Sequence, residues 1–146
     1  MLYLRDRRRR WATPGPHRVP RRQAHRIPQP VPHLRGYLLL APIEHRERII
    51  EDFSIGEHLE LQDLAYRLGQ AVSSVVPTER LYLLSLGSQQ GNRHVHWHIA
   101  PLPPGVPYNE QQFAALMADG VGYLDLSQEE QATIASWIAA AMSNQR

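Results

Sequence analysis

The chain has 146 residues, which suits a single domain, and its formal net charge is +2 at pH 7. It contains no cysteine, which excludes disulfide bonds, a thiol nucleophile and zinc sites built on thiolates. The sequence has no run of about 20 apolar residues, and its N-terminus lacks the apolar stretch of a secretory signal. We therefore expect a soluble, cytoplasmic protein with no membrane partner.

The positive charge is concentrated in residues 1–35, which hold ten arginines and a single acidic residue, Asp6. Residues 36–146 hold six arginines and thirteen acidic residues, so we do not expect the folded part to bind nucleic acid. The first segment also has six of the twelve prolines and no regular apolar pattern beyond residues 2–4. We interpret residues 1–35 as a poorly ordered tail, as the product of a mis-set start codon, or as a basic nucleic-acid-binding arm, and residues 36–146 as the domain.

Regular patterns begin at Gly36. The apolar run 36–42 ends in proline and predicts a buried strand. Ser54 and Glu57 then have the spacing of a capping box. The apolar residues that follow recur at intervals of three and four: Leu61, Leu64, Ala65, Leu68, Val72 and Val75. This pattern predicts a helix of about five turns that ends before Pro77.

The second half of the chain predicts two more strands, at residues 80–86 and 94–102. A short helix near residues 109–117 and a longer one that opens with a Ser127/Glu130 capping box should follow. The longer helix places four apolar residues on one face: Ile134, Trp137, Ile138 and Ala141. This order of strands and helices predicts an α+β fold, with helices packed against an antiparallel sheet.

Three histidines alternate with apolar residues in the last predicted strand, at positions 94, 96 and 98. Because successive side chains of a strand point to opposite faces, the imidazoles should share one face and Val95, Trp97 and Ile99 the other. Neighbouring histidines would lie about 6.6 Å apart along the strand. An imidazole titrates near neutral pH, so each could act as a nucleophile, an acid or a base.

Two other interpretations of these histidines stay open. They could form a solvated surface, or they could bind a metal ion, because imidazoles at positions i and i+2 occur in zinc sites. Three ligands on one straight strand are too far apart to converge on one ion, and no carboxylate lies near them in the sequence. Both points count against a metal site, and a metal-dependent hydrolase stands as a further hypothesis.

The pattern of residues 94–100, histidine alternating with apolar residues, resembles the signature of the histidine triad (HIT) superfamily of nucleotide hydrolases and transferases. Residues 36–45 resemble a second landmark of this family, an apolar strand followed by Pro42 and, three residues later, His45. The likeness covers roughly residues 36–108. It implies a HIT-like α+β fold and a nucleotide as small-molecule substrate, and it leaves open whether two subunits pair as a homodimer.

The resemblance also implies catalytic roles. In this family the central histidine, here His96, attacks the α-phosphorus of a nucleoside phosphoramidate or a dinucleoside polyphosphate. A covalent nucleotidyl-histidine forms, and water or another acceptor resolves it. His98 would bind the phosphoryl oxygens or the leaving group, and His94 would orient the nucleophile. The implied activity is that of a hydrolase of the phosphoramidase or dinucleoside polyphosphate type, or of a nucleotidyl transferase, with no cofactor and no obligatory metal.

Substrate binding is less clearly marked. Phosphoryl oxygens need hydrogen-bond donors in the transition state, and Gln90 and Asn92 are candidates because they directly precede the triad. Tyr37, a third candidate, stands where several family branches have a fourth histidine; its hydroxyl can hydrogen-bond but relays a proton less easily. The first strand of the family, with its ribose-binding acid, is not recognisable in residues 1–32. These departures favour, as an alternative, a catalytically weak nucleotide-binding or interaction module.

Overall fold

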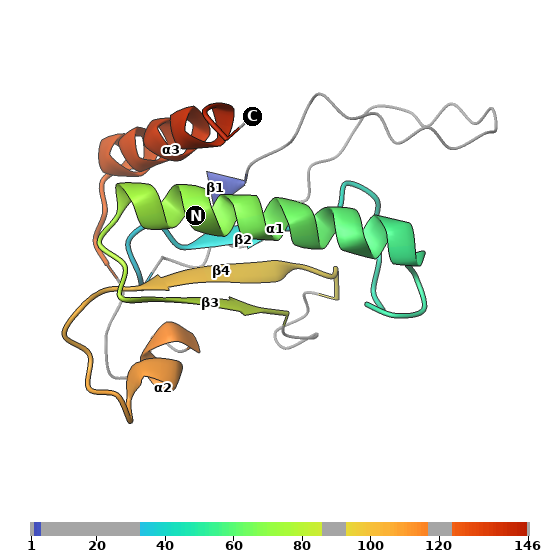
Figure 1. Ribbon diagram of the computed structural model, residues 1–146, viewed down its shortest axis with the longest axis horizontal. Coiled ribbons are helices and arrows are strands. Elements are labelled where there is room, and N and C mark those ends of the chain that lie inside the picture. The colour runs from blue at the N-terminus through green and yellow to red at the C-terminus, as the bar shows by residue number, and fades with distance from the viewer. Residues whose placement is uncertain (1, 4–32, 86–92, 117–123, 146) are drawn as a thin grey trace.

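The computed structural model describes residues 2–3, 33–85, 93–116 and 124–145. The elements in these parts are shown in Figure 1: β1 (Leu2–Tyr3), β2 (Leu38–Leu40), α1 (Ile55–Val75), β3 (Arg80–Leu84), β4 (Trp97–Leu102), α2 (Gln111–Leu116) and α3 (Gln128–Ser143). The predicted α+β class is confirmed. Strand β1 is an addition, because two residues are too short a pattern to predict a strand.

The strands form one sheet in the order β1-β2-β4-β3. β4 is antiparallel to both of its neighbours, with Leu39 of β2 and Leu84 of β3 opposite His98. Strand β1 runs parallel to β2. Directly opposed residues project to the same side of a sheet, so His98 and its two partners share one side, which we call the histidine face. Ile99 and its partners lie on the other side, the helix face.

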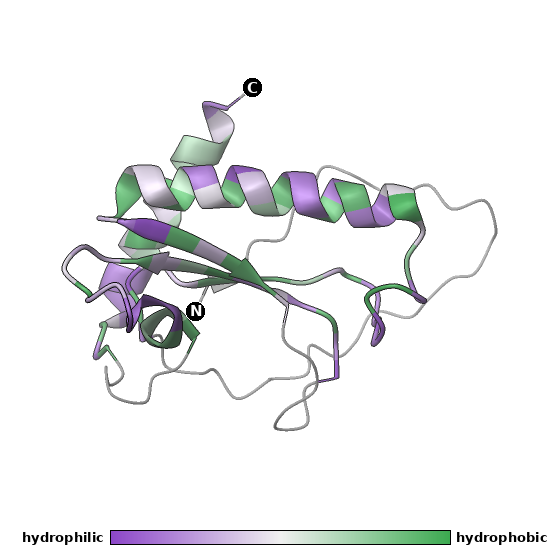
Figure 2. Ribbon diagram, turned by 60° about the horizontal axis from the view of Figure 1, so that its bottom comes forward, coloured by the Kyte–Doolittle hydropathy of each residue, from purple (hydrophilic) through white to green (hydrophobic). Residues whose placement is uncertain are grey.

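Helix α1 covers the helix face, and α3 packs on the far side of α1 (Figure 1). The predicted capping box starts α1: Ser54 Oγ accepts from the Glu57 amide, and the Glu57 carboxylate accepts from the Ser54 amide. Apolar and polar residues alternate along α1 in Figure 2, as expected of a helix that buries one side. The main core lies between these elements and comprises Leu38, Leu40, Leu61, Ala65, Leu68, Ala71, Val72, Val76, Val95, Trp97, Ile99, Ile134 and Ile138.

The histidine face has a smaller apolar cluster, formed where α2 packs against β4. Its buried residues are Leu34, Ala100, Leu102, Ala114 and Ala115. Gly36 lies at the start of β2 with a φ of +80°, and a Cβ atom there would lie 2.9 Å from Cγ2 of Val72. Glycine therefore allows the chain to pass close to the end of α1 and to enter β2 with Tyr37 against the smaller cluster.

The structure differs from the sequence-based expectations in its boundaries. Strand β4 begins at Trp97 rather than at residue 94, because its partner β2 ends at Leu40, which pairs with Trp97. His33 and Leu34, which lie within the predicted tail of residues 1–35, are buried. Residues 4–32, to which the interpretation of a poorly ordered tail mainly applies, lie outside the described residues.

Helix α3 opens with the predicted capping box, in which Ser127 and Glu130 exchange hydrogen bonds. Ile134 and Ile138, on the predicted apolar face, are buried, whereas Trp137 on the same predicted face is 50% exposed. None of the helices in the described ranges is both long and apolar enough to cross a membrane.

Candidate active site

The histidine face brings His96 and His98 together. Their ring centroids lie 4.7 Å apart, and the ring planes are inclined by 57°. His98 is part of β4, whereas His94 and His96 precede the strand. The ring of His94 stacks instead on His45, at 5.1 Å, beside the loop that follows β2. The site therefore consists of a close imidazole pair, with the third imidazole tied to a neighbouring loop.

The loop between β2 and α1 holds His94 through backbone groups. Nε2 of His94 lies 2.9 Å from the carbonyl oxygen of Pro42, and Nδ1 lies 3.2 Å from both the amide nitrogen and the carbonyl oxygen of Arg46. A carbonyl oxygen can only accept, so Nε2 carries a proton, and in the neutral ring Nδ1 accepts from the Arg46 amide. The Val95 amide also donates to the Arg46 carbonyl, at 2.7 Å. These bonds fix both the ring and the backbone of His94.

The carbonyl group of His94 sets the tautomer of His96. Nδ1 of His96 lies 2.7 Å from this oxygen and must donate to it. A neutral imidazole has one proton, so Nε2 of His96 keeps a free lone pair, and it has no hydrogen-bond partner within the described ranges. Ser85 Oγ donates to the His96 carbonyl, at 2.8 Å, and so steadies the backbone from β3. In the neutral ring, the geometry therefore leaves the lone pair on Nε2.

Tyr37 contacts the second member of the pair. Its hydroxyl lies 2.5 Å from Nδ1 of His98, and the two rings meet edge-on at 5.8 Å. Burial raises the pKa of Tyr37 to about 12, so the phenol stays protonated near neutral pH. The pKa of His98 is lowered to about 4, mainly by burial and further by the charges that His96 and His33 would carry. His98 is therefore neutral at pH 7.

Nε2 of His98 is buried and has no hydrogen-bond partner among the residues that the structure describes. Buried polar atoms are nearly always paired, because an unpaired one costs roughly 1–3 kcal/mol. An exception of this kind next to a free lone pair on His96 is typical of a ligand-binding position.

His33 is a residue of the site that the sequence analysis missed. It is 8% exposed, Nε2 donates to the carbonyl oxygen of Ala115 at 3.1 Å, and its ring lies 5.0 Å from that of Tyr37. Burial lowers the pKa of His33, and the hydrogen bond to Ala115 partly opposes this effect. No local pattern could have revealed His33, because its partner lies 82 residues later in the chain.

Of the six residues predicted for the site, the structure joins three: His96, His98 and Tyr37. His94 acts on His96 through its backbone carbonyl group. Gln90 and Asn92 lie outside the described residues. Within the described ranges, no group of three or more His, Cys, Asp or Glu side chains is arranged to hold a metal ion.

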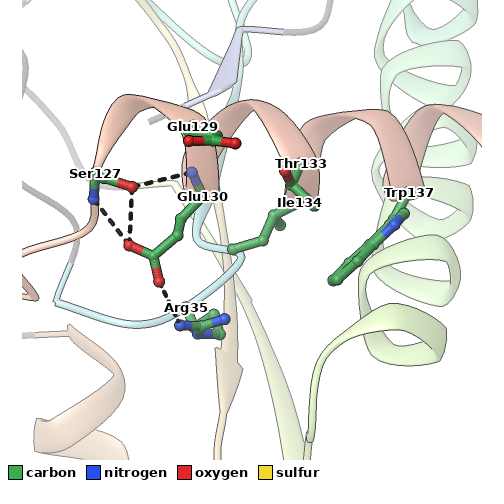
Figure 3. A pocket seen from close by; sticks show the side chains of 7 residues that line it. All are labelled: Arg35, Ser127, Glu129, Glu130, Thr133, Ile134 and Trp137. Carbon is green, nitrogen blue, oxygen red and sulfur yellow. Dashed lines mark hydrogen bonds and ion pairs between the residues drawn. The ribbon is translucent and has the colours of Figure 1, made fainter.

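Away from the histidine face, an open depression of about 230 Å³ lies between α3 and the turn before β2 (Figure 3). Its lining residues are Arg35, Ser127, Glu129, Glu130, Thr133, Ile134 and Trp137. The Glu130 carboxylate accepts from Ser127 of the capping box and from Arg35, at 3.3 Å. The charges of Arg35 and Glu130 thus serve the structure of the protein, and the reactive groups lie on the histidine face.

The comparisons with known proteins find a likeness among solved structures. No family model matches the sequence, and no curated protein matches it. Among solved structures, the chain is similar to a hypothetical histidine triad nucleotide-binding protein from Sulfolobus tokodaii strain 7. The TM-score is 0.59 and the identity 21%, over 78% of this chain and 74% of the other. The chain therefore has the HIT-like fold that the alternating histidines predict.

Proposed function

We propose that the protein is a nucleotide hydrolase or nucleotidyl transferase in which Nε2 of His96 attacks the α-phosphorus of a nucleoside phosphoramidate or a dinucleoside polyphosphate. The observation that carries this proposal is the hydrogen bond from Nδ1 of His96 to the His94 carbonyl, because it leaves the lone pair on Nε2. The nucleotide-binding protein of the same fold supports a nucleotide as the ligand. We place this activity in the cytoplasm.

The reaction has two displacements. In the first, Nε2 of His96 forms a bond to phosphorus, the bond to the leaving group breaks, and the leaving group takes the electron pair. The His94 carbonyl stabilises the positive charge that the nucleotidylated ring acquires, because it already accepts a hydrogen bond from Nδ1–H. In the second, water or another acceptor attacks phosphorus, the P–N bond breaks, and the electron pair returns to Nε2. The proton of the acceptor passes to solvent or to the released group.

The other residues bind the substrate or position the nucleophile. His98 would use its free Nε2 for a phosphoryl oxygen or the leaving group, because this atom is buried, unpaired and adjacent to the nucleophile. His94 is a positioning residue that acts through its carbonyl group. Gln90 and Asn92 would add donors to the phosphoryl oxygens.

A covalent adduct tests the proposal directly. The protein is mixed with diadenosine tetraphosphate or adenosine 5′-phosphoramidate, quenched at alkaline pH, and analysed by intact mass and peptide mapping. We expect one adenylyl group on His96 and none in His96→Ala. The variant His58→Asn is a matched control, because the ring of His58 contacts Trp97 on the helix face; it should keep the adduct. An adduct on another residue, or turnover that survives His96→Ala, would contradict the proposal.

The burial of the nucleophile favours a second candidate. His96 is only 9% exposed, which would slow the approach of a bulky substrate. The protein would then be a nucleotide-binding module with weak catalysis. Tight nucleotide binding by calorimetry, with neither an adduct nor product, would select this function.

A further inference from the structure

Tyr37 determines which protons His98 can hold. Burial raises the pKa of Tyr37 to about 12, so the phenol keeps its proton. Among the described residues the hydroxyl has one hydrogen-bond partner, Nδ1 of His98, and we assign the O–H as the donor because the reverse assignment would leave its buried hydrogen without an acceptor. With Nδ1 occupied as an acceptor, the proton of the neutral imidazole must lie on Nε2. This places an N–H donor at the buried position that has no partner among the described residues.

The groups that the structure describes around the His98 ring disfavour a second proton on it, because none of them offers a negative charge. The titratable groups around it within the described ranges are Tyr37, His96 and His33, and none of them is negative near neutral pH. Protonation at Nδ1 would also force the Tyr37 hydroxyl to turn its hydrogen away. His98 can therefore stabilise a developing negative charge by a hydrogen bond, but it cannot supply a proton.

This distinction matters for the leaving group. When a phosphoanhydride breaks, the departing phosphate is a stable anion and needs only hydrogen bonds. When a phosphoramidate breaks, the departing nitrogen is strongly basic and must receive a proton as the P–N bond lengthens. General acid catalysis of this kind contributes roughly 10²–10⁴-fold to the rate.

We propose that Tyr37 makes the site selective for nucleotides joined through a P–O–P bond, such as dinucleoside polyphosphates, over nucleoside phosphoramidates, by holding His98 as a neutral N–H donor. The inference rests on the function proposed above and names its substrate class. In the favoured step, Nε2 of His96 bonds to the α-phosphorus, the P–O bond to the bridging oxygen breaks, and that oxygen leaves with the electron pair as a phosphate anion. No proton from His98 is consumed.

Two substrates with the same adenylyl group test the selectivity: diadenosine tetraphosphate and adenosine 5′-phosphoramidate. We expect kcat/KM for the anhydride to exceed that for the amidate by about 100-fold or more. In Tyr37→His, a side chain that can relay a proton should narrow this ratio by about tenfold or more, through a higher kcat for the amidate. The amidate kcat of this variant should also acquire a pH dependence near neutral pH.

Two further variants separate positioning from folding. Tyr37→Phe keeps the ring but frees Nδ1 of His98, so we expect a lower kcat for the anhydride with little change in KM. Tyr66→Phe is the matched control, since Tyr66 is exposed on α1 and its hydroxyl bonds only to a surface glutamine, Gln70, among the described residues. This control should leave both substrates and both pH profiles unchanged.

The outcomes distinguish this inference from the proposed function. If the wild type turns over the amidate as fast as the anhydride through an adduct on His96, the selectivity is wrong and the function stands. A ratio that does not change in Tyr37→His and Tyr37→Phe also overturns the role of Tyr37. If neither substrate forms an adduct, the function itself fails.

Discussion

On the helix face of β4, Trp97 and Ile99 are 4% and 0% exposed and lie in the core that α1 and α3 complete. On the histidine face, one residue away along the chain, the rings of His96 and His98 each make a single hydrogen bond among the described residues, to a backbone carbonyl and to a phenol. The first face gains stability from burial of apolar surface. The second keeps a lone pair and a buried nitrogen without partners, which costs stability.

The comparison of the two faces shows how one strand can provide both stability and reactive groups. Because side chains alternate, a β-strand can place its stabilising contacts and its reactive groups on opposite sides without a shared atom. The helix face must then contribute enough to offset the unpaired groups on the other side. Substitutions should therefore separate stability from chemistry according to the face on which they lie.

The largest expected effect on stability is on the helix face. Ile99→Ala removes buried methyl groups from a residue that is 0% exposed, and we expect it to lower the free energy of unfolding by about 2–5 kcal/mol. Urea unfolding at pH 7 measures this change. His98→Asn keeps an acceptor for Tyr37 and should cost clearly less. Equal losses of unfolding free energy in the two variants would contradict the division of stability and chemistry between the two faces.

A second test concerns the backbone turn at Gly36, which leads into β2 and so affects both faces of the sheet. Its φ of +80° and the short distance to Val72 should make Gly36→Ala lower the free energy of unfolding by about 1–3 kcal/mol. Gly105→Ala is the control, because Gly105 also has a positive φ, of +95°, but a Cβ atom there would meet nothing within 4 Å among the described residues. A larger loss of unfolding free energy at Gly36 would measure the cost of the close contact with Val72 of α1. If the two variants lose the same amount, only backbone strain matters.

The third test is a pH dependence that belongs to the histidine face. The pKa of His98 falls from 6.5 to about 4 in the folded protein, so between these values the unfolded chain binds more protons. Its contribution to stability is therefore complete above pH 6.5 and is lost as the pH falls towards 4. Urea midpoints between pH 7 and pH 4 should decline less steeply in His98→Asn than in the wild type. Parallel curves would show that His98 does not titrate in this window.

Much of the fold follows from local patterns. The capping boxes at Ser54 and Ser127 and the apolar spacing of α1 involve residues within a few positions of one another, and the structure has them as predicted. The alternation around Trp97 likewise predicted which side of the strand enters the core. Trp137 shows the limit, since helical spacing places it beside Ile134 and Ile138 but does not decide how far the contact with α1 extends.

The site was only partly predictable. The histidine pattern identified His96 and His98 as neighbours on one face, and Tyr37 was marked as a departure from the family pattern. That the Tyr37 hydroxyl reaches His98 depends on the register that pairs Leu39 with His98, two residues further along β2. The bonds from His94 to Pro42 and Arg46 depend on the path of a loop about 50 residues earlier in the chain.

By itself the sequence determined the α+β class, the helices with their caps, and the separation of His96 and His98 from Trp97 and Ile99, because these follow from the periodicity of neighbouring residues. Only the tertiary structure decided which nitrogen of each imidazole is free. Those tautomers are set by a carbonyl group, a phenol and a helix end that strand pairing and packing bring from distant parts of the chain.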